Sequence, residues 1–110
     1  MRLNEMRSTV ASTTGGIMTE EVGAVTGKLE VATYPRRGSI EIKVRYAGAD
    51  EWYTVEGSPV QLDNAGDLSP SELRDLHERV IKHLTTPGVI MEGNEEATSL
   101  QGFSPIVGGR

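Results

Sequence analysis

The stretch IEIKVRY, residues 40 to 46, decides the fold class because apolar and charged side chains alternate strictly along it. Successive side chains of a β-strand point to opposite faces of the sheet. One face would therefore hold the apolar members, Ile40, Ile42, Val44 and Tyr46, and the other the charged members, Glu41, Lys43 and Arg45. This pattern predicts a strand in an antiparallel sheet with one face against a core and one face in water.

Two further strands are predicted beside this one. Residues 28 to 34 alternate well enough for a first strand, and the turn-forming residues 35 to 38 (PRRG) separate it from the central one. Residues 47 to 50 make the next turn, and residues 51 to 56 return as a third strand. Residues 60 to 62 read as a short fourth strand or as an extended lead into the next loop. Connections this short predict an antiparallel meander.

One helix follows the predicted sheet. Residues 69 to 72 (SPSE) form a capping box with proline at the first helical position. A stripe at helical spacing follows, made of Leu73, Leu76, Val80 and Leu84. Laying this stripe on the apolar face of the meander is the usual way for a single sheet to be covered. We therefore predict an α+β fold in which a small antiparallel meander of three to four strands packs against one C-terminal α-helix.

The segments outside this unit read as irregular tails. Residues 1 to 23 are rich in serine, threonine and glycine and show no periodicity, which predicts a flexible N-terminal tail. Residues 24 to 88 form the predicted domain of meander and helix. Residues 89 to 110 are punctuated by glycine and predict a C-terminal tail that could dock on the domain, because apolar residues cluster near its end.

Composition disfavours several classes of protein. The chain has 110 residues and a formal net charge of −5, whereas nucleic-acid-binding proteins normally carry a basic face. It contains no cysteine and only two histidines, so we expect no disulfide, no cofactor and no structural metal. No apolar run approaches the roughly 20 residues that span a bilayer. We expect a cytoplasmic protein with no nucleic-acid or membrane partner.

The predicted core is small. A domain of the size predicted for residues 24 to 88 buries only about 60% of the surface of its unfolded chain. One helix also covers only part of the predicted sheet. Additional burial would come either from tails that pack back on the domain or from association of two copies through the sheet edge or the uncovered face. A homodimer is therefore one of the two arrangements that the sequence leaves open.

Candidate protein-binding residues lie on the open sheet face and in the C-terminal tail. Trp52 and Tyr53 are adjacent on the predicted third strand, so one of them faces away from the core. If Tyr53 faces the core, Trp52 stands on the open face beside Thr54, Arg45 or Lys43, and exposed tryptophan beside arginine is typical of interaction surfaces. In the tail, the candidates are Phe103, Ile106 and Val107, which would dock on the domain or engage a partner.

His77 is the one histidine on the flank of the helix stripe. Its position predicts a packed and hydrogen-bonded helix residue. As a general base it would need a hydroxyl nucleophile or a carboxylate nearby, and the sequence places only Asp75 and Glu78 next to it. No triad, phosphate loop or metal-ligand spacing accompanies it, so we predict no catalytic residue.

Two segments of the chain echo each other. TTGGIMTEE, residues 13 to 21, and TTPGVIMEGNEE, residues 85 to 96, both place paired threonines before a glycine-containing apolar stretch and paired glutamates. This order resembles the core segments of graspetides, ribosomally made peptides in which a ligase joins Thr hydroxyls to Glu carboxylates as esters. The resemblance implies two modified sets, Thr13, Thr14, Glu20 and Glu21, and Thr85, Thr86, Glu95 and Glu96. A plainer interpretation is that soluble segments lead into and out of a small domain.

Taken together, the residues favour a non-catalytic protein that binds another protein, or its own copy, through the open sheet face and the C-terminal tail. The alternatives are a ribosomal peptide precursor modified at its Thr and Glu pairs, and a small ligand-binding dimer that uses His77.

Overall fold

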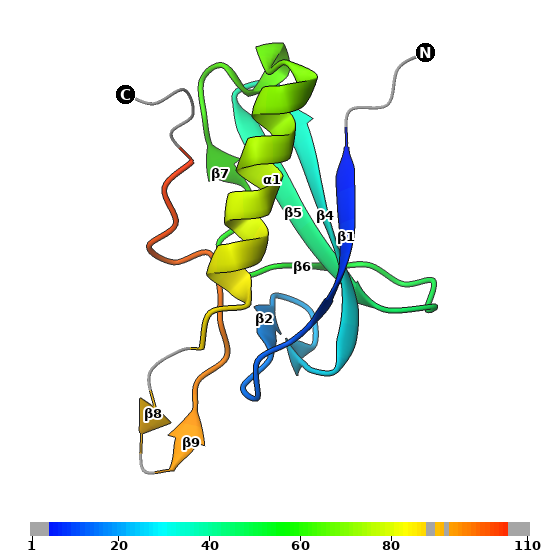
Figure 1. Ribbon diagram of the computed structural model, residues 1–110, viewed down its shortest axis with the longest axis vertical. Coiled ribbons are helices and arrows are strands. Elements are labelled where there is room, and N and C mark those ends of the chain that lie inside the picture. The colour runs from blue at the N-terminus through cyan, green and yellow to red at the C-terminus, as the bar shows by residue number, and fades with distance from the viewer. Residues whose placement is uncertain (1–4, 88–89, 92, 106–110) are drawn as a thin grey trace.

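The computed structural model describes residues 5–87, 90–91 and 93–105 (Figure 1). An antiparallel sheet forms one layer and a single α-helix crosses it as the other. This arrangement confirms the α+β fold class. Among the described residues, no helix is both long and apolar enough to cross a membrane.

The main sheet has five strands. Its order is β1 (Met6–Ala11), β4 (Lys28–Arg36), β5 (Ser39–Tyr46) and β6 (Tyr53–Thr54), and β7 (Val60–Gln61) pairs with the beginning of β5. All pairings are antiparallel, and β4, β5 and β6 form the predicted meander. The third strand is shorter than predicted, because it spans only Tyr53 and Thr54, although the backbone N–H of Val55 also donates to the carbonyl of Ile42 on β5.

The N-terminal segment differs from the flexible tail predicted for residues 1 to 23. Met6–Ala11 forms β1, which pairs along its whole length with β4. Ile17–Thr19 (β2) and Gly23–Val25 (β3) form a second, two-stranded sheet, and Ile17 and Val25 are buried in the core. The prediction of a flexible tail was wrong because β1 depends on partners that are distant in sequence. Ser8, on its inward side, is an example, because its hydroxyl pairs with His77.

The helix α1 (Pro70–Leu84) begins at the predicted capping box. The backbone N–H of Glu72 donates to Ser69 Oγ over 3.1 Å, and the backbone N–H of Ser69 donates to Glu72 Oε1 over 2.9 Å. A short 3₁₀ helix, η1 (Ala65–Asp67), precedes it. The predicted stripe is buried, and His77 is buried beside it. The helix therefore covers the sheet with the face that its sequence predicts.

The core lies between α1 and the inner face of the main sheet. The sheet contributes large side chains that are fully buried, namely those of Leu29, Val31, Ile40, Ile42 and Val44. Leu76, Val80 and Leu84 meet them from the helix. Burying such side chains is the main favourable term in folding, at roughly 25 cal/mol per Å² of apolar surface.

Part of the segment expected to be a C-terminal tail belongs to the fold. The backbone N–H of Thr98 donates to the carbonyl of Gly16, and that of Leu100 donates to the carbonyl of Glu56. Thr98 and Leu100 are both buried. Before them, β8 (Ile90–Met91) and β9 (Asn94–Glu95) form a small hairpin that extends away from the domain (Figure 1). Residues 98 to 103 are therefore anchored on the domain.

Candidate functional site

The outer face of the main sheet carries two of the predicted interaction residues, Arg45 and Trp52. Alternation places Arg7 and Thr9 of β1 on this face, together with Glu30 of β4 and Arg45 of β5. The register aligns Thr9, Glu30 and Arg45 in one row across the three strands. In the described part of the chain no helix covers these side chains, because α1 packs on the inner face.

Trp52 lies on this outer face, where two arginines contact its ring. The guanidinium carbon of Arg45 is 4.5 Å from the centroid of the Trp52 ring, and that of Arg7 is 5.4 Å from it. Cations within about 6 Å of an aromatic centroid are attracted by the negative face of the ring. The sequence left Thr54, Arg45 and Lys43 as possible neighbours of Trp52, and the structure brings Arg45 to its ring.

Ion pairs orient both arginines. Arg45 contacts Glu30 Oε1 through both Nε and Nη2, each over 2.8 Å. Arg7 donates from Nε to Glu5 Oε2 over 2.7 Å. The Arg45 and Glu30 side chains are about one-fifth exposed, whereas the Arg7 side chain is 48% exposed. Of the two arginines that contact Trp52, Arg45 is therefore the less exposed and Arg7 the more exposed.

Ala32 explains how a tryptophan fits over the middle of the sheet. It stands opposite Arg7 on one side and Lys43 on the other, in the outer-face row of β4. Although it lies on the exposed face, Ala32 is fully buried. Arg7 and Arg45 contact the Trp52 ring from the two strands that flank β4, and the small, buried Ala32 lies on the outer face of β4 between those strands. We call Arg7, Ala32, Arg45 and Trp52 the tryptophan clamp.

Phe103, the described member of the predicted tail site, lies elsewhere. Its ring meets the His83 ring edge-on, with centroids 5.4 Å apart, and the Arg79 guanidinium lies 6.0 Å from its centroid. Both partners belong to α1, on the opposite side of the sheet from the tryptophan clamp. The other predicted tail residues, Ile106 and Val107, lie outside the described residues.

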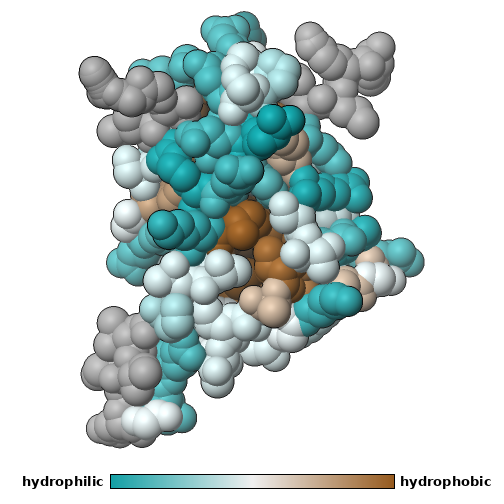
Figure 2. Space-filling view, in the orientation of Figure 1, coloured by the Kyte–Doolittle hydropathy of each residue, from teal (hydrophilic) through white to brown (hydrophobic). Residues whose placement is uncertain are grey.

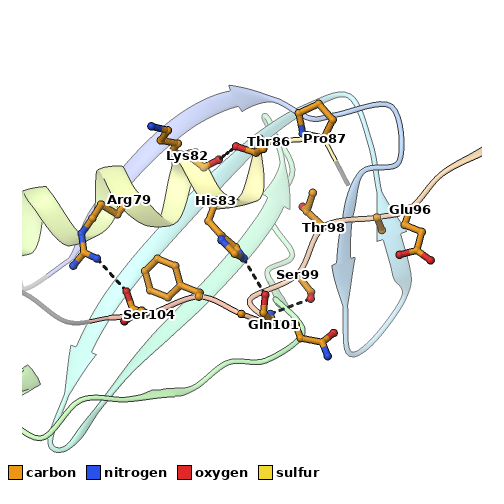
Figure 3. A pocket seen from close by; sticks show the side chains of 13 residues that line it. Arg79, Lys82, His83, Thr86, Pro87, Glu96, Thr98, Ser99, Gln101 and Ser104 are labelled. Carbon is orange, nitrogen blue, oxygen red and sulfur yellow. Dashed lines mark hydrogen bonds between the residues drawn. The ribbon is translucent and has the colours of Figure 1, made fainter. Parts of the chain in front are cut away.

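A hollow of about 670 Å³ separates the C-terminal half of α1 from the segment that carries Phe103 (Figure 3). Arg79 donates to the carbonyl of Ser104, and His83 Nε2 lies 3.2 Å from the carbonyl oxygen of Gln101. These contacts bridge the helix and the C-terminal segment, as Figure 3 shows. The basic side chains that line the hollow therefore serve in part to hold residues 101 to 104 in place.

His77 has the packed and hydrogen-bonded environment that its position predicts. Its Nε2 lies 2.8 Å from Ser8 Oγ, and its Nδ1 lies 2.8 Å from Thr33 Oγ1. Only 4% of the residue is exposed, and this burial lowers the pKa of the imidazole. Both ring nitrogens are engaged, so His77 ties α1 to β1 and β4.

The echoed segments meet in the structure. Gly15 lies so close to the backbone of Glu95 and Glu96 that a side chain there would overlap their carbonyls, and just beyond the second segment Thr98 forms a parallel bridge with Ile17. The hydroxyls of Thr85 and Thr86 donate to carbonyls of α1, namely those of Ile81 and Lys82. These threonines therefore cap the helix terminus.

Glu21, from the first echoed segment, binds β6. It accepts hydrogen bonds from the backbone N–H and the hydroxyl of Thr54 over 2.8 and 2.9 Å, and these bonds lower the pKa of its carboxyl. The contact joins the turn after β2 to the outer face of the main sheet. The composition of the predicted N-terminal tail gave no indication of this contact between Glu21 and Thr54.

Sequence reasoning also missed Arg7 as a member of the tryptophan clamp. It belongs to β1, which the sequence assigned to a tail, so its place on the sheet could not be derived. The alternation of charged Arg7, polar Thr9 and small Ala11 with Met6 and Val10 was the available signal. Within the described ranges, no cluster of histidine, aspartate and glutamate has a geometry that could hold a metal ion.

Comparisons of this chain with family models, curated proteins and solved structures found no match.

Proposed function

We propose that this chain is a non-catalytic cytoplasmic protein that binds another protein through the tryptophan clamp. The contact of Trp52 with Arg45 and Arg7, at 4.5 and 5.4 Å, carries this proposal. Tryptophan and arginine are among the residues most enriched in the energetic centres of protein interfaces. The anchored segment around Phe103 is a second and smaller contact surface.

Preorganisation supports the choice of this face. The ion pair with Glu30 holds Arg45 in place, so the Trp52 side chain loses little further freedom when a partner covers it. Arg7 is more exposed and has guanidinium donors beyond the one used by Glu5. A fitting partner therefore offers an apolar surface to the Trp52 ring and a carboxylate to Arg7.

Capture by the immobilised full-length chain tests this function. A partner is retained from an extract of the cell that makes the protein, and the Trp52→Ala variant loses at least about 90% of it, a loss that corresponds to roughly 1.4 kcal/mol or more. Tyr46→Ala is the matched control, because Tyr46 is 43% exposed and lies outside the tryptophan clamp. This control retains the partner.

Phe103→Ala tests the second surface without removing buried residues. Deletion of residues 98 to 110 is unsuitable, because it would remove Thr98 and Leu100 from the fold. If the Trp52 and Phe103 variants both capture the partner as the unchanged chain does, the proposed function is wrong.

A further inference from the structure

The two edges of the main sheet are treated differently by the rest of the molecule. At the β6 edge, the backbone N–H of Glu20 donates to the carbonyl of Thr54, and Thr19 forms a bridge with Val55. The turn after β2 therefore covers that edge. At the other edge, β1 (Met6–Ala11) pairs only with β4 among the described strands.

The register identifies which backbone groups of β1 point away from the sheet. The backbone N–H of Ser12 donates to the carbonyl of Gly27, and this pair continues the register in which Val10 stands opposite Leu29. Hydrogen-bonded pairs alternate along an antiparallel ladder. The even-numbered residues of β1 therefore direct their backbone groups at β4, and Arg7, Thr9 and Ala11 direct theirs outward. No hydrogen bond from another described segment reaches these outward groups.

Within the described residues, this edge lacks the usual features that prevent pairing with another chain. Natural edge strands are protected by proline, bulges, inward-pointing charges or a covering segment. β1 contains no proline, its only charged residue is Arg7, and Arg7 is held at Glu5 and Trp52 on the outer face. An unprotected edge of this length is a site for strand addition.

An apolar patch lies beside the same edge, on the face that carries α1. Ile81 is one helical turn beyond His77, a rise of about 6 Å, and Val10 is two residues beyond Ser8, a rise of about 6.7 Å. Since His77 contacts Ser8, Val10 and Ile81 lie at one level. Both are partly exposed, and Figure 2 shows apolar side chains gathered between α1 and β1.

We infer that two copies of this chain associate by antiparallel pairing of their β1 strands, with Thr9 opposite Thr9 of the second copy. In this register all three outward residues exchange hydrogen bonds, because Arg7 stands opposite Ala11 and Ala11 opposite Arg7. No like charges face each other, whereas a register centred on Arg7 would oppose two arginines. A Thr–Thr pair occupies the two-fold axis, and such cross-strand pairs are favourable.

The second copy fits this edge because the edge is complementary to itself, as a two-fold interface requires. The added strand also covers the flank of Val10, which stands opposite Ser8 of the second copy. The axis is perpendicular to the sheet, so both tryptophan clamps lie on one side of a continuous sheet. The dimer therefore presents two binding surfaces in the same direction, which strengthens binding to a partner that has two matching sites.

Charges introduced at the two-fold axis test this inference on the full-length chain. Light scattering and native mass spectrometry show twice the chain mass for the unchanged protein. Thr9→Lys and Thr9→Glu each weaken the dimer roughly fivefold or more, because like charges stand opposite at the axis. An equimolar mixture of the two variants restores the dimer, since the introduced ammonium of one copy then faces the introduced carboxylate of the other.

Ala11→Glu provides a second readout that does not depend on the axis residue. It places a carboxylate opposite Arg7 and strengthens the dimer. A monomeric unchanged protein overturns the inference, and so does a dimer that neither Thr9 variant weakens. The tests of the tryptophan clamp use Trp52 and leave β1 unchanged, so failure of one proposal is distinguishable from failure of the other.

Discussion

On the inner face of the main sheet, Ile40, Ile42 and Val44 are fully buried, whereas on the outer face the neighbouring side chains Glu41, Lys43 and Arg45 remain partly exposed. One strand thus supplies both faces through the alternation of its residues. The inner face gains its stability from burial under α1. The outer face gains little from burial and holds a preformed contact of tryptophan and arginine. This difference indicates that the inner face supplies most of the folding free energy, and the proposed function assigns recognition to the outer face.

The largest effect is expected where α1 packs against the inner face of the sheet. Leu76 is fully buried in the core, and Leu76→Ala should lower the free energy of unfolding by about 2 to 5 kcal/mol. The matched outer-face change, Lys43→Ala, should alter it by no more than about 0.5 kcal/mol. Urea unfolding followed by circular dichroism measures both. Equal losses for the two variants would contradict the assignment of stability to the inner face.

A smaller effect on the inner face follows from the protonation of His77. Burial lowers the pKa of His77 in the folded protein below its ordinary value of 6.5, and the charge of Glu78 opposes this shift more weakly. Below about pH 6.5 the unfolded chain therefore binds a proton that the folded protein does not. The contribution of neutral His77 to the free energy of unfolding is fully present above that pH and is lost as the pH falls.

Stability should therefore fall by at most about 1.4 kcal/mol per pH unit from this group as the pH falls below about 6.5. Urea unfolding at a series of pH values measures the slope. His77→Gln keeps a donor and an acceptor for Ser8 and Thr33 but does not titrate, so it should flatten the slope in this window. An unchanged slope in the variant would show that His77 is not the group responsible.

An effect on stability smaller than that of Leu76→Ala is expected for Trp52 on the outer face. Trp52→Ala removes two contacts with arginine, each worth about 0.5 to 1 kcal/mol at partly exposed sites. The free energy of unfolding should therefore fall by about 1 to 2 kcal/mol, less than for Leu76→Ala. A loss as large as that of Leu76→Ala would mean that Trp52 is a core residue, and loss of capture would then report unfolding.

Sequence predicted the elements that local pattern determines. The alternation in β5 and the capping box of α1 are complete within a few residues, so their form does not depend on distant partners. The neighbourhood of Trp52 and Arg45 followed from the same alternation. The fold class and this pair were therefore predictable from the sequence.

The elements that depend on distant partners were not predictable in the same way. β1 is stabilised by pairing with β4 and by the contact of Ser8 with His77, 69 residues away. Leu100 is anchored by the carbonyl of Glu56 and by burial in the core. The alternation in β1 is weak, because small and polar residues occupy most of its positions, and each segment contributes only a few side chains to the core.

Hydroxyl-radical labelling of the captured complex tests most directly whether the outer face is the recognition face. Trp52 is the one tryptophan of the chain, so its oxidation is read separately from that of other residues. The proposed function predicts that Trp52 is protected in the complex and that Tyr46 is oxidised as in the free protein. Protection of Tyr46 with unchanged oxidation of Trp52 would place the partner away from the tryptophan clamp and contradict the proposal.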